Sequence, residues 1–210
     1  KATITLRVLK VAPKDWKKLL DTSVADFWNI TNKISKLMAQ SGYVKKNGPV
    51  GWVPNAFQPV VDGVVLLHNP FDPTAPAISK NKPLMTGWNE DEFTFFAMSF
   101  GDTSAWKSDF TFAELPAKLE SQFGSNTKSI IDTYRQTMPN ATASNIWVAI
   151  ESINMMGLGT RKIAERKVEQ QGAPVYLYNF GYKSESKVPG TDYAFGTPHA
   201  MDITFKFYNE

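Results

Sequence analysis

The chain has 210 residues, of which 42% are hydrophobic and 13% aromatic, enough for a substantial core in one domain or one large part of a domain. The 23 basic and 20 acidic residues nearly balance, and a net charge of +3 is too small to indicate nucleic-acid binding. Cysteine is absent, which excludes disulfides, Cys-based zinc sites and a thiol nucleophile. No apolar run is long enough to span a bilayer, and the first residues lack a signal-peptide pattern, so the compartment stays open.

The opening third of the chain favours helices. Pro13 suits a first helical turn, and apolar residues between Val24 and Leu37 recur at spacings near three and four, with Gly42 predicted to end the helix. The next part is different, because seven prolines lie between Pro49 and Pro83. This composition predicts a looped region around a short extended piece, "VVDGVVLL".

Two segments are predicted to be strands, and helices are predicted between them. "KPLMTGWN" is a short apolar run after a proline, and "APVYLYNFGY" is the clearest strand because it is rich in Val and Tyr and bounded by Pro and Gly. Helical crossovers favour parallel pairing in an α/β sheet. Since two strands alone do not make a stable sheet, we expect further strands elsewhere. The predicted helices cover residues 93–100, 111–124, 125–140, 142–156 and 159–172.

Smaller features of the chain can also be predicted. Thr111 is the expected N-cap of the helix over 111–124, with Glu114 as its capping-box partner. "GLGT", residues 157–160, is predicted to be a turn that separates two helices. "RKIAERK", residues 161–167, and the basic stretch over 36–46 are predicted to be solvated helix faces.

Polar residues follow both predicted strands, where α/β folds gather their reactive groups. Glu90, Asp91 and Glu92 follow the first strand, and a loop after the second leads to His199. An acid followed by a histidine is the chain order of an α/β-hydrolase triad, in which the carboxylate accepts the imidazole Nδ1–H. The alternatives are a solvated acidic turn and a structural histidine. His68, the only other histidine, lies in a Pro-rich loop and is expected to pack at the surface.

Four segments together resemble the type-B carboxylesterases, the carboxylesterase/lipase and cholinesterase-like family, especially its bacterial members. They are "FQPVVDGVVLLHNPFD", "KPLMTGWNEDEFTFF", "GAPVYLYNFGYKSE" and "GTPHAMDITFKFYN". The resemblance covers about residues 10 to 208. It implies part of an α/β-hydrolase fold and ester hydrolysis through an acyl-enzyme, with no metal and no organic cofactor. Phe93, where many relatives have glycine, and Trp88 depart from the family pattern.

The resemblance also implies residue roles. Glu92 is the expected triad acid and His199 the general base, while Asp91 is a structural neighbour and Asp202 orients the histidine loop. Candidates for the substrate pocket are aromatic and Met residues of the helical block. Packing in a core is the alternative role for each of them. These candidates are Phe93, Phe96, Trp147, Met155 and Met156.

No G-x-S-x-G nucleophile elbow and no Gly-rich oxyanion segment occur in the 210 residues. We therefore expect a segment from the C-terminal half of one hydrolase domain, whose partners are a small ester and the remaining segments that carry the nucleophilic serine. Two other functions stay open: a non-catalytic cholinesterase-like binding or adhesion domain, and a helical partner-binding module. The expected parts are a helical lead-in (1–42), a Pro-rich loop and strand (43–92), a helical cap (93–172), and a strand with the histidine loop (173–210).

Overall fold

The computed structural model describes residues 2–40, 61–99, 101–102, 104–106 and 110–208. Its contacts divide the chain into two compact units, residues 1–68 and 69–210. Among the described residues, no helix is both long enough and apolar enough to cross a membrane.

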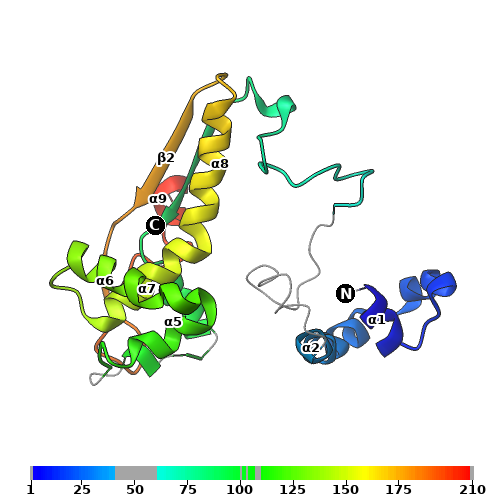
Figure 1. The fold of residues 1–210 in the computed structure, drawn as a ribbon, viewed down its shortest axis with the longest axis horizontal. Coiled ribbons are helices and arrows are strands. Elements are labelled where there is room, and N and C mark those ends of the chain that lie inside the picture. The colour runs from blue at the N-terminus through cyan, green and yellow to red at the C-terminus, as the bar shows by residue number, and fades with distance from the viewer. Residues whose placement is uncertain (1, 41–60, 100, 103, 107–109, 209–210) are drawn as a thin grey trace. The chain divides into compact units, whose positions relative to one another are not determined.

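Residues 2–40 of the N-terminal unit are mostly helical, as predicted (Figure 1). It contains α1 (Ala2–Val8), the 3₁₀ helix η1 (Pro13–Asp21) and α2 (Val24–Gln40). Ser23 caps α2, because its Oγ accepts the Asp26 N–H at 3.1 Å. Gly42, the predicted end of this helix, lies outside the described residues.

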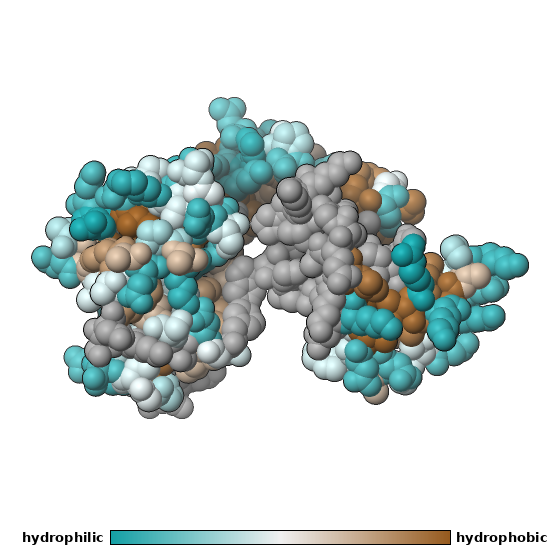
Figure 2. Space-filling view, turned by 60° about the horizontal axis from the view of Figure 1, so that its bottom comes forward, coloured by the Kyte–Doolittle hydropathy of each residue, from teal (hydrophilic) through white to brown (hydrophobic). Residues whose placement is uncertain are grey.

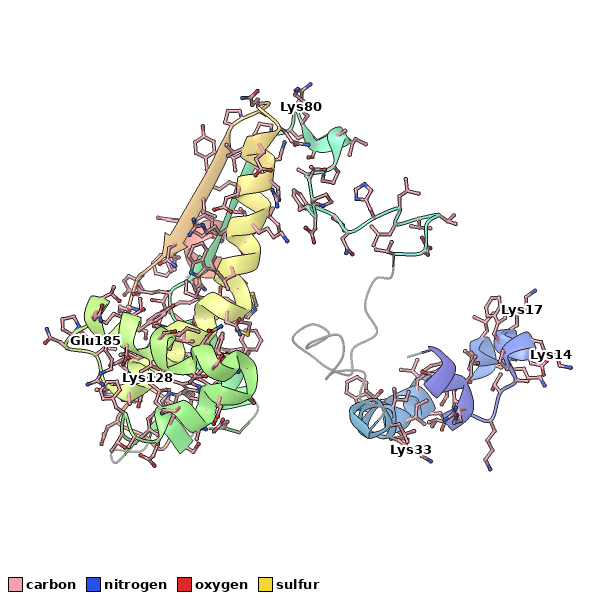
Figure 3. All side chains as sticks on the ribbon, in the orientation of Figure 1. Lys14, Lys17, Lys33, Lys80, Lys128 and Glu185 are labelled. Atoms are coloured by element: carbon pink, nitrogen blue, oxygen red, sulfur yellow. The ribbon has the colours of Figure 1, made fainter. Side chains whose placement is uncertain are left out.

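The surface of this unit combines apolar and charged side chains. Val24 and Trp28 are 84% and 79% exposed, and apolar surface is visible in brown on this unit in Figure 2. Exposed lysines also lie here, as labelled in Figure 3 for Lys14, Lys17 and Lys33. The helical spacing of apolar residues in α2 therefore does not by itself mean that every one of them is buried in the unit.

The prediction of an extended piece around Asp62 is wrong for the described residues 61–67, whose backbone bends and forms no strand. Asp62 Oδ1 accepts the N–H groups of Val64, Val65 and Leu66 at 2.9, 2.9 and 3.0 Å. These N–H groups bond to the carboxylate and are therefore not available for hydrogen bonds to a neighbouring strand. The same hydrogen bonds, from Val64 first, lower the pKa of Asp62.

The second unit contains a parallel pair of strands, which confirms the predicted strands and their pairing. Strand β1 (Leu84–Asn89) lies beside β2 (Val175–Phe180), with Leu84 opposite Val175 and Asn89 opposite Phe180. In Figure 1 the long helix α8 runs along this pair. A parallel pair needs a crossover, and helices provide it here.

The crossover is helical over most of its length. Its elements are α4 (Glu92–Ser99), η3 (Ser104–Trp106), α5 (Leu115–Phe123), η4 (Gly124–Asn126), α6 (Thr127–Thr137), α7 (Ala143–Ser152), η5 (Ile153–Gly157) and α8 (Leu158–Glu169). A short 3₁₀ helix, η2 (Ala77–Ser79), precedes β1.

The predicted turn at residues 157–160 is wrong, because the chain stays helical there. The π-helical turn η5 joins α7 directly to α8. A Cβ on Gly157 would lie 2.9 Å from Ile153 Cδ1 and 3.3 Å from Trp88 Cε2. This glycine lets the helix approach Trp88 of β1 closely, and the packing offsets the roughly 1 kcal/mol that glycine costs inside a helix.

Two smaller predictions also need correction. Helix α5 begins at Leu115, so Thr111 does not cap it, although the Thr111 N–H and hydroxyl both donate to Glu114 Oε2 at 2.8 Å. Pro116 in the first turn favours this later start. The face over 161–167 is not wholly solvated, because Lys167 is 3% exposed and its ammonium donates to the Ser79 and Lys80 carbonyls. The side chains of the other basic stretch, 36–46, lie mostly outside the described residues.

The segment after β2 contains structure where a loop was predicted. Strand β3 (Ser184–Lys187) pairs in antiparallel fashion with β4 (Ala194–Gly196), and helix α9 (Asp202–Phe207) follows the histidine. The ring of Phe205 in α9 lies 5.2 Å from Phe180 of β2, which packs this helix beside the parallel strands.

The hydrophobic core of the second unit lies among the crossover helices. Its members include Leu115, Leu119, Ile146, Trp147 and Val148, all at most 2% exposed.

We expect Trp147→Ala to lower the free energy of unfolding by about 3–5 kcal/mol, because it removes a large buried side chain and leaves a cavity. Urea unfolding of the protein measures the loss. Trp16→Ala is the matched control, since Trp16 is 51% exposed and its removal should change stability by less than about 0.5 kcal/mol. Equal losses for the two variants would contradict the core assignment.

Glu151 of α7 is a buried carboxyl, 4% exposed, and Gln122 Nε2 donates to its Oε1 at 2.6 Å. Burial raises the pKa of Glu151, against the opposing hydrogen bonds from Gln122 and Asn154. A raised pKa of an acid in the folded state means that ionisation opposes folding once the pH exceeds the unfolded-state value.

We therefore expect Glu151→Gln to become increasingly stable relative to wild type as the pH rises from about 4 to 7. Thermal unfolding at several pH values measures this difference. Glu120→Gln, at an exposed position of α5, should show no such trend. A stability difference for Glu151→Gln that is constant with pH would contradict the assignment.

Candidate active site

The candidate site lies where the segments after β1 and β2 meet. Glu92 begins α4, three residues after the end of β1, and His199 lies between β4 and α9. The parallel register places the carboxyl ends of the two strands at one edge of the sheet, which brings these distant segments together.

Glu92 is held on both carboxylate oxygens. Its Oε1 accepts the backbone N–H of Asn89 at 2.8 Å, and its Oε2 lies 2.6 Å from His199 Nδ1. The side chain of Glu92 is 7% exposed. Its place in the first turn of α4 favours a negative charge, because unpaired N–H groups point out of a helix N-terminus.

His199 is the accessible member of this pair, with 39% of its side chain exposed in the described structure. A carboxylate only accepts hydrogen bonds, so an ionised Glu92 requires a proton on Nδ1 and leaves Nε2 of a neutral imidazole as the acceptor. The centroid of the Phe96 ring lies 4.7 Å from that of the imidazole, and the centroid of the Phe95 ring lies 5.9 Å from it. The arrangement presents a basic nitrogen beside an aromatic surface.

Asp91 contacts the segment just before the histidine. It forms two hydrogen bonds with the backbone of Thr197: its N–H donates to the Thr197 carbonyl, and its side-chain Oδ2 accepts the Thr197 N–H at 2.8 Å. Lys183 Nζ also lies 2.6 Å from Asp91 Oδ2. Burial would lower the pKa of Lys183, but the hydrogen bonds and charges of Asp91 and Glu90 outweigh it, and the pKa is raised.

Asp202, in the first turn of α9, follows the histidine by three residues in the sequence. Its carboxylate accepts hydrogen bonds from Asn89 Nδ2 at 3.3 Å, from the Tyr178 hydroxyl at 3.4 Å and from Lys206. Burial would raise the pKa of Asp202, but the hydrogen bonds from Lys206 and Asn89 outweigh it, and the pKa is lowered. Asp202 is therefore an ionised acceptor near neutral pH.

The residues predicted to line a pocket lie in different environments. Phe96 is beside His199. Trp147 belongs to the core, and Phe93 packs edge-on against it at 4.9 Å, with its N–H donating to Ser152 Oγ. Met155 and Met156 are half-buried in the turn η5. Phe96 is therefore the predicted residue whose ring packs against the imidazole.

Sequence reasoning missed two participants in this site. Phe95 was overlooked beside Phe96, although both follow the acid within one helical turn. Asn89 is the second, and it contacts both halves of the site. Its role depends on the contact with Pro198, 109 residues away, so no local sequence pattern could have found it.

His68, the other histidine, is an exposed residue of the N-terminal unit. Within the ranges that the structure describes, no group of three His, Asp or Glu side chains is arranged to bind a metal ion.

Comparison with known proteins gives one family. The model of the carboxylesterase family matches residues 29–210. No sequence among curated proteins matches the chain.

Solved structures of bacterial esterases share its fold. The carboxylesterase of Geobacillus stearothermophilus at pH 6.2 is 22% identical with a TM-score of 0.60, over 99% of this chain and 38% of that one. The same enzyme at pH 6.8 gives 19% identity and a TM-score of 0.56, over 99% of this chain and 36% of that one. An esterase from Clostridium hathewayi, described as able to hydrolyse aliphatic aromatic polyesters, gives 20% identity and a TM-score of 0.52, with coverage of 97% and 36%. The chain therefore spans well under half of these enzymes.

Proposed function

The chain belongs to the carboxylesterase family and forms part of an α/β-hydrolase fold, and on this premise we propose that it supplies the acid and the base of a Ser-Glu-His catalytic triad. The observation that carries the proposal is the 2.6 Å contact between Glu92 Oε2 and His199 Nδ1. A buried acid paired with an accessible imidazole is the arrangement that general-base catalysis requires.

In the proposed reaction, a serine outside residues 1–210 attacks the carbonyl carbon of an ester. Nε2 of His199 takes the serine proton, and Glu92 holds the ring and stabilises the imidazolium. His199 then gives this proton to the departing alkoxide, which leaves an acyl-enzyme and an alcohol. Water attacks the acyl-enzyme by the same route, so the carboxylic acid leaves and the serine is regenerated. Backbone N–H groups outside this chain stabilise the oxyanion, and no metal or organic cofactor takes part.

The surroundings of His199 support an ester with an apolar group. Phe96 and Phe95 form an aromatic surface next to the imidazole, and Phe95 is 38% exposed. In the proposal these rings contact the substrate beside the reacting carbonyl. Met155 stays a predicted pocket residue, whereas the burial of Trp147 in the core supports a packing role instead.

Hydrolysis of p-nitrophenyl acetate tests the proposal. The protein that combines this chain with the nucleophile-bearing segment should turn over the ester and lose activity on treatment with a fluorophosphonate. Residues 1–210 alone should show no turnover, because they lack a nucleophile elbow. Lack of turnover in the combined protein would instead favour the non-catalytic binding or adhesion domain.

A further inference from the structure

The segment "NEDE" of residues 89–92 lies along the segment "GTPH" of residues 196–199. Asn89 Nδ2 donates to the Pro198 carbonyl at 2.8 Å, Asp91 exchanges hydrogen bonds with Thr197, and Glu92 contacts His199. Successive residues of the histidine loop are therefore each fixed by the end of β1 or the residues that follow it.

Within this arrangement, Asn89 contacts both halves of the candidate pair. Its backbone N–H donates to Glu92 Oε1, and its side chain donates to the residue before His199. The same Nδ2 also donates to Asp202 Oδ1 at 3.3 Å, three residues after His199. Asn89 thus holds the acid through its backbone and the histidine loop through its carboxamide.

The chemistry of the partners fixes the orientation of this carboxamide. A peptide carbonyl and an ionised carboxylate are both acceptors, so only the NH₂ end of Asn89 can face them. Asn89 is 1% exposed, and its Oδ1 has no donor among the described residues. A buried amide oxygen without a hydrogen-bond donor lowers the stability of the fold. The two hydrogen bonds that Asn89 Nδ2 donates offset this loss.

The histidine loop also has a backbone that needs support. Ala200, directly after His199, has φ of 68°, and Gly196 has φ of 67°. A left-handed conformation is unfavourable for alanine and persists where surrounding contacts impose it. The Asn89 bonds to Pro198 and Asp202 lie on either side of Ala200 and can impose it.

We infer that Asn89 is a positioning residue that sets the Glu92–His199 hydrogen bond by fixing the histidine loop to the acid. The catalytic consequence rests on the proposed esterase function. Asp91 has a different role, because its side chain bonds to Thr197 and Lys183 rather than to Glu92. Without the Asn89 carboxamide, the imidazole loses its fixed direction toward Glu92, and the hydrogen bond between them opens more often.

The test replaces Asn89 in the protein that combines this chain with its nucleophile. Asn89→Ala should lower kcat by about 10- to 100-fold and leave KM within about twofold, since a small misplacement of a catalytic group slows chemistry. Residues 1–210 hold two histidines, so ¹⁵N-histidine labelling confined to this segment resolves the His199 Nδ1–H, with a His68→Gln sample for assignment. This proton signal, present in wild type, should be lost through fast exchange in Asn89→Ala.

Asn145→Ala is the matched control. Asn145 forms the capping box of α7 with Thr142, so its loss weakens the fold without a contact to the candidate pair. This variant should lose stability and yet keep the wild-type kcat and the His199 proton signal. A signal and kcat that survive in Asn89→Ala would overturn the inference.

Two further measurements keep the inference testable. If Asn89→Ala does not fold, as judged by circular dichroism, slow exchange of the Asn89 carboxamide protons in wild type is the expected result, and fast exchange would overturn the inference. If wild type hydrolyses no ester, the proposed function fails. The proton signals of His199 and Asn89 still decide the positioning role.

Discussion

Replacing His199 with alanine is expected to lower kcat for ester hydrolysis by at least about 10⁴-fold, because the variant has no group to take the serine proton. The fold should survive, since the side chain is 39% exposed and outside the hydrophobic core. Steady-state hydrolysis of p-nitrophenyl acetate measures the loss, and circular dichroism checks the fold.

The second histidine supplies the control for this experiment. His68→Ala removes the other imidazole of the chain, an exposed one in the N-terminal unit, and should leave kcat unchanged within about twofold. Retained activity in His199→Ala would remove His199 from the mechanism.

Replacing Glu92 with glutamine is expected to lower kcat by about 10³- to 10⁴-fold while KM changes little. An amide can present its NH₂ group to Nδ1, which stabilises the tautomer that carries its proton on Nε2 and cannot accept one from serine. It also removes the negative charge that stabilises the imidazolium. The residue contacts His199 at 2.6 Å, so the substitution acts directly on the base.

Glu90→Gln separates this effect from a general loss of negative charge. Glu90 is exposed, two residues away, and pairs with Lys183 at 3.0 Å. Exposed ion pairs contribute little, so activity should stay within about twofold of wild type. A comparable loss in both variants would contradict a specific role for Glu92.

The strands and their pairing could be predicted because their signals are local and strong. The Val- and Tyr-rich run at 175–180 and the apolar run at 84–89 are bounded by Pro, Gly or polar residues, and helical segments between them favour parallel pairing. The hairpin of β3 and β4 could not be predicted in this way. "SESK" at 184–187 has no apolar alternation, and its pairing depends on a three-residue partner strand.

The continuous helix through Gly157 was missed for a different reason. Two glycines close together suggest a turn, but Gly157 allows the helix to approach Trp88 of β1. That contact joins residues far apart in the sequence, and a local pattern does not contain it. Tertiary packing overrides helix propensity at this position.

The same distinction applies to the site. Chain order and family resemblance led to Glu92 and His199, and the structure places these two side chains in contact. The contribution of Asn89 depends on a hydrogen bond across 109 residues, which leaves no local signature. The pocket candidates could not be divided into core and site residues from the sequence. An aromatic residue in a helix gives the same pattern whether it packs in the core, as Trp147 does, or beside the imidazole, as Phe96 does.

If Glu92 and His199 activate a serine outside residues 1–210, as we propose, a fluorophosphonate label will locate that serine. In the protein that combines this chain with its nucleophile, mass spectrometry of labelled peptides should find one modified serine, within a G-x-S-x-G segment outside residues 1–210. Labelling should be far slower in His199→Ala. A label on no serine, a label within residues 1–210, or equal labelling rates in wild type and His199→Ala would rule out the proposed triad.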